Sequence, residues 1–184
     1  MKKIFICLCL LTFMFLLTGC EFSFSTHRES AVLYFSATGT TKTIAEKIAK
    51  ESDSDLIEII PKEKYKESDL TYNEKDRAMT EQNDEKSRPE IENDIDINGY
   101  NTIYLGFPIW FNYNPRIIYT LLDKYDFSGK TIIPFCTSGS SDITDSVTAL
   151  RNNYSNLTIK DGKRFAGDAS DEEIEKFVNE NSNN

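Results

Sequence analysis

The stretch that decides the fold is AVLYFS (31–36), ATGTTK (37–42) and TIAEKIA (43–49). The first block is mostly apolar, with β-branched and aromatic side chains, which is typical of a strand buried on both faces. The last block places Ile44 and Ile48 at helical spacing and predicts an amphipathic helix. The stretch therefore predicts a strand that leads through a short turn into a helix.

The turn between these blocks is dense in hydroxyl groups and contains one glycine and no acidic residue. Backbone N–H groups and the positive end of the helix converge on such a turn, which suits an anion and above all a phosphate. A threonine that caps the helix in the ordinary way would give the same pattern. The turn lacks the Walker pattern and the three glycines of a dinucleotide fingerprint.

The residues before Ala31 form a targeting segment. Lys2 and Lys3 precede an apolar run (4–17) that is shorter than the roughly 20 residues needed to span a bilayer and suits a signal peptide. The run ends in LTGC (17–20), which resembles a bacterial lipobox with Cys20 as the acylated residue. A plain signal peptide, or a short anchor with a chance cysteine, is the alternative.

This leader predicts three parts: a lipoprotein signal peptide at 1–19, a tether at 20–30 and one domain at 31–181. It places the domain on the cell membrane, held by lipid on Cys20 and facing outside the cytoplasm. After the leader and Cys20 only Cys136 remains, so an internal disulfide is excluded and a buried, inert thiol is predicted. The single histidine, His27, lies in the tether, so we expect no His-based metal site or catalytic triad.

The charge of the chain points to one class of partner. The formal net charge is −9, and it becomes −11 without the leader, which carries two lysines and no acidic residue. A surface this acidic argues against nucleic acid and against electrostatic membrane binding. It fits a partner protein with a basic docking face.

Strands and helices alternate along the domain, which predicts a parallel sheet covered on both faces. Strands are predicted at 31–36, 55–60, 100–107 and 131–136, with a short fifth strand between 157 and 165. Helices are predicted at 43–49, about 73–85, from Pro115, about 142–153 and from a capping-box-like start at Ser170. The highly charged residues 61–98 are expected to hold no central strand and one solvent-facing helix.

Three turns meet at the carboxyl ends of these strands, where such sheets bind ligands. They are residues 36–42, residues 107–113 (FPIWFNY) and residues 137–141 (TSGSS). The first offers hydroxyl and N–H groups, the second an aromatic platform and the third a small polar loop. Trp110 alone would also suit a core position, but the three turns together predict a site for a flat aromatic ligand with a phosphate tail.

At these turns the sequence resembles the flavodoxin family. YFSATGTT (34–41) is similar to the FMN phosphate loop of that family, GFPIWF (106–111) to its isoalloxazine loop, and GK (129–130), PF (134–135) and TSGS (137–140) to its third loop region. The resemblance implies a flavodoxin-like three-layer α/β sandwich, with a five-stranded parallel sheet, and non-covalent FMN. By position it assigns the phosphate to Ser36, Thr38, Gly39, Thr40 and Thr41, the ring border to Pro108, Ile109, Trp110 and Phe111, and the far edge of the ring to Ser138 and Gly139.

The chain also departs from the family pattern. Many relatives have a second aromatic residue and a glycine after the tryptophan, where this chain has Phe111 and Asn112, and asparagine tolerates a positive φ. We expect Trp110 to stack on the ring. The third loop has no aromatic residue, so a second stacking ring would have to come from Tyr65 or Tyr72.

The function that this resemblance implies is electron transfer by an FMN-binding lipoprotein, since FMN carries the redox chemistry and the protein tunes it. An acidic, apolar-walled site is expected to disfavour the anionic reduced form. We assign no catalytic residue and no metal ligand, and we expect a monomer. Two alternatives stay open: an FMN-dependent reductase of quinone-like or nitroaromatic acceptors, and a non-catalytic flavin-binding or partner-docking lipoprotein.

Overall fold

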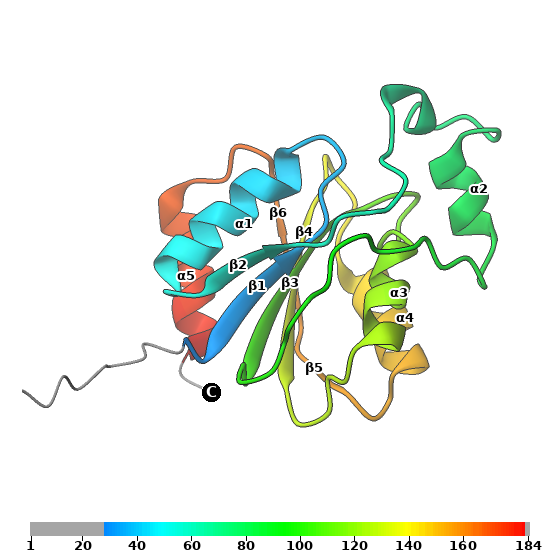
Figure 1. The fold of residues 1–184 in the computed structure, drawn as a ribbon. Helices are drawn as coiled ribbons and strands as arrows, with labels where there is room; N and C mark the ends of the chain where they lie inside the picture. Colours follow the sequence, from blue (N-terminus) through cyan, green and yellow to red (C-terminus); the bar gives the residue numbers. More distant parts are fainter. Residues whose placement is uncertain (1–27, 183–184) are drawn as a thin grey trace, which may run out of the picture.

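A parallel sheet forms the centre of the fold in the computed structural model, which describes residues 28–182 (Figure 1). Its strands are β1 (Ser30–Tyr34), β2 (Asp55–Glu58), β3 (Thr102–Pro108), β4 (Thr131–Thr137), β5 (Thr158–Ile159) and β6 (Lys163–Phe165). Their spatial order is β2-β1-β3-β4-β5, and β6 also pairs with β4. The predicted three-layer α/β sandwich with five parallel strand positions is confirmed.

Helices cover both faces of this sheet. On one face lie α1 (Thr40–Glu51) and α5 (Asp171–Ser182), and on the other lie α3 (Ile117–Lys124) and α4 (Thr144–Asn153) (Figure 1). The short 3-10 helix η1 (Glu67–Asp69) and the helix α2 (Arg77–Asn83) lie between β2 and β3 in the chain. The capping box at the start of α5 is confirmed, because Ser170 N–H donates to Glu173 Oε2 and Glu173 N–H donates to Ser170 Oγ, both at 3.2 Å.

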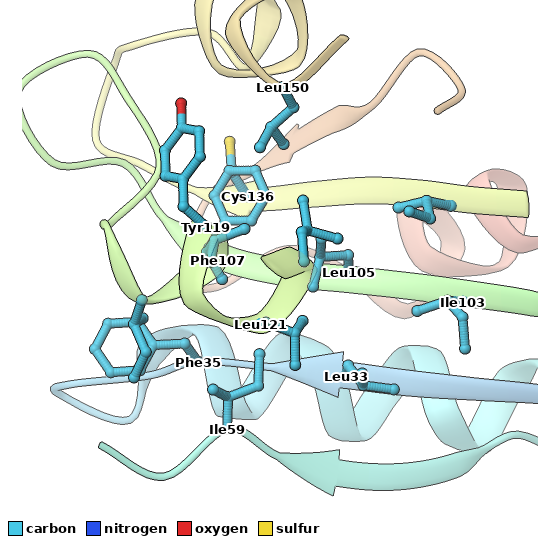
Figure 2. Close-up of a cluster of buried hydrophobic side chains, with 14 of the residues drawn as sticks. Leu33, Phe35, Ile59, Ile103, Leu105, Phe107, Tyr119, Leu121, Cys136 and Leu150 are labelled. Atoms are coloured by element: carbon cyan, nitrogen blue, oxygen red, sulfur yellow. The ribbon is translucent and has the colours of Figure 1, made fainter. Parts of the chain in front are cut away.

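The core has two halves because side chains alternate across each strand. Along β1, Val32 and Tyr34 pack under α1 and α5, while Leu33 and the following Phe35 pack on the opposite side. Figure 2 shows this second half, where Leu121 of α3 and Leu150 of α4 belong to the same cluster. Cys136 also lies in this cluster, fully buried as predicted, and burial raises the pKa of its thiol to about 12.

The predicted fifth strand is split into β5 and β6. Ile132 pairs with Ile159 and Phe135 pairs with Lys163, so the outer chain uses one residue more than β4 over this distance. The extra residue lies opposite Pro134, which has no N–H group to give to a neighbouring strand. The interruption is therefore a local bulge beside a proline in a central strand.

Two predicted boundaries are wrong. Residues 28–30, assigned to the tether, belong to the domain: Arg28 pairs with Asp55 at 2.9 Å, and the Glu29 carbonyl accepts the Asn101 N–H at 2.8 Å. The helix predicted at 73–85 is limited to α2 and is not purely solvent-facing, because Ala78 is 2% exposed and packs in the core. The side chain of Asp76 binds Asn73 N–H and Thr71 Oγ1, which stabilises a turn just before α2.

The predicted signal peptide, Cys20 and residues 20–27 of the tether lie outside the described residues. Within residues 28–182, none of the helices has the length and apolar character that a membrane crossing requires.

Candidate cofactor site

A cavity of about 670 Å³ lies at the carboxyl ends of the central strands. Most of the predicted binding residues line it, namely Thr38, Thr40, Thr41, Pro108, Ile109, Trp110, Phe111, Ser138 and Gly139. Ser36 and Gly39 do not line it, but they are part of the first turn, in which the Gly39 N–H donates to Ser36 Oγ. The remaining lining residues are Ala37, Leu70, Tyr72, Asn112, Thr137, Ser140, Ser141, Ala166 and Gly167. Within residues 28–182 every lining side chain is uncharged, so the expectation of acidic walls is wrong.

The first turn presents an uncapped helix end to the cavity. Gly39 occupies the N-cap position of α1 with φ of 91°, and its N–H donates to Ser36 Oγ at 3.1 Å. Among the described residues, no side chain caps the helix, which excludes the ordinary threonine cap, and the first turn has no acidic residue. The N–H groups of residues 40–42 have no acceptor within residues 28–182. This helix end therefore offers free donors and a positive dipole to an anion.

The hydroxyl groups of this turn are not equivalent. Thr38 and Thr40 are exposed, and their hydroxyl oxygens lie 3.4 Å apart. Thr41 is only 1% exposed, and its hydroxyl bonds to that of Thr137, at the end of β4, at 2.7 Å. Thr41 thus joins the turn to the central sheet and offers a ligand its N–H group more readily than its hydroxyl.

The aromatic turn on the opposite side, residues 110–113, is a tight hairpin. Trp110 N–H donates to the Tyr113 carbonyl at 2.9 Å, and Tyr113 N–H donates to the Trp110 carbonyl at 3.0 Å. Between them Phe111 and Asn112 both have positive φ, at 50° and 70°. Asn112 takes this conformation as expected, whereas a phenylalanine in it is strained and must be held by its surroundings.

Trp110 lies deeper than a simple stacking platform. It is 6% exposed, and its ring packs edge-on against Phe35 at 5.5 Å and Tyr65 at 4.9 Å between centroids. Tyr65 therefore packs against Trp110 and does not line the cavity. This excludes Tyr65 as the second residue that could stack on the ligand ring. Stacking of Trp110 on a ring stays a prediction.

Tyr72 is the aromatic side chain that the region between β2 and β3 brings to the cavity. It is 65% exposed, has φ of 63°, and lies edge-on to Phe111 with ring centroids 5.1 Å apart. Of the two alternatives considered from the sequence, Tyr72 is thus the one at the site. Leu70 lies beside it on the cavity wall and has no signal in the sequence, because its position depends on how this region folds back.

The third loop closes the cavity and is tied to both neighbouring segments. Ser141 Oγ donates to Asn112 Oδ1 at 3.2 Å, and Arg164 of β6 donates to the Gly139 carbonyl at 2.7 Å. Ala166 and Gly167, which sequence reasoning missed, follow β6 at the same edge of the sheet. The rule that ligands bind beyond the carboxyl ends of parallel strands could have identified them. Across residues 28–182, no group of three potential metal ligands lies together.

Comparison with known proteins agrees with this geometry. The sequence profile described as flavodoxin matches residues 29–181. This chain belongs to the flavodoxin family. No curated protein matches it.

Solved structures of bacterial flavoproteins resemble this flavodoxin-family chain. A candidate flavoprotein from Bacteroides uniformis ATCC 8492 is 40% identical, with a TM-score of 0.80, over 82% of this chain and 97% of that one. A candidate flavoprotein from Bacteroides eggerthii DSM 20697 is 37% identical, with a TM-score of 0.78, over 82% and 96%. A flavoprotein from Lactobacillus acidophilus NCFM, solved in complex with FMN, is 29% identical, with a TM-score of 0.62, over 82% and 98%.

Proposed function

We propose that this flavodoxin-family protein binds FMN and transfers electrons. The observation that carries the proposal is the uncapped N-terminus of α1, which faces a cavity walled on another side by an aromatic turn. The flavoprotein of Lactobacillus acidophilus in complex with FMN supports the choice of cofactor.

The residues present fit FMN at both ends. At the phosphate end, the N–H groups of residues 40–42 and the hydroxyls of Thr38 and Thr40 are donors, with no carboxylate in the first helical turn to repel the charge. At the ring end, Ile109, Phe111 and Tyr72 provide apolar and aromatic surface. A volume of about 670 Å³ lies within the usual range of cofactor pockets.

FMN, when bound, supplies the redox chemistry, and the protein binds, orients and shields it. The uncharged walls place no fixed charge directly against the ring, so hydrogen bonds and ring packing would set its potential. Among the described residues that line the cavity, only Tyr72 has an ionisable group, and it is exposed to solvent. A site without a buried acid or base supports an electron carrier over an enzyme that moves protons to a substrate.

The test is the visible spectrum of the purified chain after addition of FMN or riboflavin. We expect flavin absorption bands and a preference for FMN, because the free donors of α1 act on the phosphate alone. Equal affinity for riboflavin would contradict the assignment of the phosphate end. Oxidation of a nicotinamide donor then separates functions: turnover that needs a reductase indicates a carrier, and direct turnover with quinone-like or nitroaromatic acceptors indicates a reductase.

We further propose that the protein works on the outer face of the cell membrane, anchored by lipid on Cys20. Two or more acyl chains give stable anchoring, which a lipoprotein cysteine provides. Cys20→Ser should release the protein or leave an uncleaved precursor, with FMN binding unchanged. Protection of the domain from protease added to intact cells or spheroplasts would contradict the outer location.

The partner that we propose is a redox protein with a basic docking face. We also propose that this chain is a monomer when it binds that partner. The formal charge of −9 supports this choice, as does the start of α5, where Asp171, Glu172 and Glu173 are exposed. Electron exchange with such a partner should slow as salt rises, because salt screens the attraction. A rate independent of salt would contradict the docking proposal.

A further inference from the structure

The segment between β2 and β3, residues 62–90, is called the insertion here, and its two ends lie side by side. Pro61 and Ile91 form an antiparallel bridge, Lys62 N–H donates to the Glu90 carbonyl at 2.9 Å, and Glu92 N–H donates to the Ile60 carbonyl at 2.8 Å. Figure 1 shows the insertion beyond the end of the sheet, beside α3. A segment closed at its base can hold its inner residues in fixed positions.

Gln82, in α2 of the insertion, holds the first residue of the aromatic turn and the residue that directly follows the turn. Its Nε2 donates to the Trp110 carbonyl at 2.9 Å and to the Asn114 carbonyl at 3.2 Å. Arg116 in turn donates to the backbone carbonyl of Gln82 at 2.7 Å, which fixes the end of α2 against the start of α3. One amide therefore spans the turn that carries Phe111 and Asn112, the two residues with positive φ.

The neighbouring residue, Glu81, supports the same turn through a ring. Tyr65 donates its hydroxyl to Glu81, and its ring packs edge-on against Trp110 at 4.9 Å. Arg77 pairs with Glu81 at 2.6 Å and lies 4.2 Å above the Tyr65 ring. Adjacent residues of α2 thus support Trp110 in two ways: Gln82 binds its carbonyl directly, and Glu81 holds the Tyr65 ring that packs against the indole.

We propose that Gln82 is a positioning residue for the cofactor ring. By fixing the Trp110 carbonyl at the start of this strained turn and the Asn114 carbonyl just after it, Gln82 holds Phe111 in the conformation that lines the cavity. The inference rests on the proposed binding of FMN. The helix α2 does not line the cavity. The inference predicts that α2 nevertheless affects how tightly the cavity binds the flavin ring and leaves binding of the phosphate unchanged.

The test compares three variants of the full-length chain, purified in detergent. Gln82→Glu keeps the size of the side chain but replaces the donor with a carboxylate against two carbonyl oxygens. Gln82→Met removes the donor without adding charge. Asn83→Asp is the matched control, because it makes the same change from amide to acid at the next, exposed position. Affinity for FMN and for riboflavin is measured in each, together with hydrogen exchange of the Trp110 and Tyr113 amides without flavin.

The Gln82 variants lose both hydrogen bonds, which leaves the buried Asn114 carbonyl without a donor within residues 28–182, while the Trp110 carbonyl keeps the Tyr113 N–H. This loss should weaken both flavins about tenfold. The ratio of FMN to riboflavin affinity should stay as in the wild type, and the two amides should exchange faster. Asn83→Asp should change neither. A merely structural role would instead weaken the phosphate end as well and change the ratio.

Three results would overturn the inference: unchanged flavin affinity in both Gln82 variants, a loss confined to FMN, or an equal loss in Asn83→Asp. If the wild type binds neither flavin, the proposed function fails by itself. The exchange measurement then still decides the positioning role, since unchanged exchange of the two amides in the Gln82 variants would refute it.

Discussion

The two ends of the cavity are built in different ways. The phosphate end is made of consecutive residues, in which a strand, a glycine with φ of 91° and a helix follow one another. The ring end is assembled from the aromatic turn and from an insertion whose residue Tyr65 lies 45 positions before Trp110 in the chain. Local backbone geometry thus creates one end, and packing between distant segments creates the other. Substitutions at the two ends should therefore fail in different ways.

The largest effect is expected for Trp110→Ala, at the ring end. The indole is buried against Phe35 and Tyr65, so its removal leaves a cavity in the core and should lower the free energy of unfolding by about 3–5 kcal/mol. Urea unfolding measures this loss. Tyr113→Ala, which removes an exposed ring from the same turn, should cost less than about 0.5 kcal/mol. Equal stability of the two variants would mean that Trp110 is no part of the core.

Gly39→Val tests the phosphate end, where the expected damage is to binding. A β-branched residue at φ of 91° strains the turn by about 1–3 kcal/mol and misplaces the N–H groups that follow. FMN affinity should fall about ten- to a hundredfold, and riboflavin affinity should fall much less. Lys42→Ala, an exposed charge in the same turn, should have a smaller effect. A larger loss of FMN affinity in Lys42→Ala than in Gly39→Val would mean that the phosphate is bound mainly by the Lys42 charge and not by the backbone N–H groups.

This contrast also separates what the sequence predicts from what it does not. The strand, turn and helix at residues 31–49 follow from local pattern, and the structure has them within a few residues. Asn112 with positive φ was likewise predictable, because asparagine tolerates that conformation. The burial of Trp110 was not predictable, because it depends on Phe35 and Tyr65, which approach it only in the folded chain.

The insertion shows the limit most clearly. Its charged composition predicts no central strand and one solvent-facing helix, and most of its residues are exposed. A few others decide its role: Ala78 packs in the core, Gln82 binds the aromatic turn, and Tyr72 lines the cavity. No periodic pattern marks these residues, since each contact is to a distant segment. The break between β5 and β6 was not predictable either. It lies opposite Pro134 of β4, which has no N–H group, and the sequence does not show which segment pairs with β4 at that position.

Tyr72→Ala should have a moderate effect, confined to the ring end. Its edge-on contact with Phe111 and its place on the cavity wall predict a contribution of about 0.5–1.5 kcal/mol, which is roughly two- to tenfold in affinity. FMN and riboflavin should lose the same factor, because both carry the ring. Flavin titration of Tyr72→Ala and Tyr113→Ala measures it. Tyr113 does not line the cavity. An equal loss of flavin affinity in Tyr113→Ala would therefore show that the effect of Tyr72→Ala does not come from its place on the cavity wall.

The smallest effect is expected where the insertion is attached to α3 by charge, at Asp123. Arg88 Nε pairs with Asp123 Oδ2, and the Tyr154 hydroxyl donates to Asp123 Oδ1, both at 2.6 Å. Desolvation raises the pKa of Asp123, but the hydrogen bonds from Arg88 and Tyr154 outweigh it, and the pKa lies below its ordinary value. A carboxyl with a lowered pKa stabilises the fold above its unfolded pKa of about 3.9 and loses this contribution as the pH falls through the folded value.

Asp123→Asn should therefore lower the free energy of unfolding by about 0–1 kcal/mol at neutral pH, since the pair is partly exposed, and by nothing in strong acid. Urea unfolding at both pH values measures this, with Glu74→Gln as the control for loss of an exposed charge in the insertion. Flavin affinity should not change, because the Arg88 contact lies on α3 and holds no part of the aromatic turn. A loss of flavin affinity as large as that expected for Gln82→Glu would show that the ring end depends on docking of the whole insertion and not on one amide.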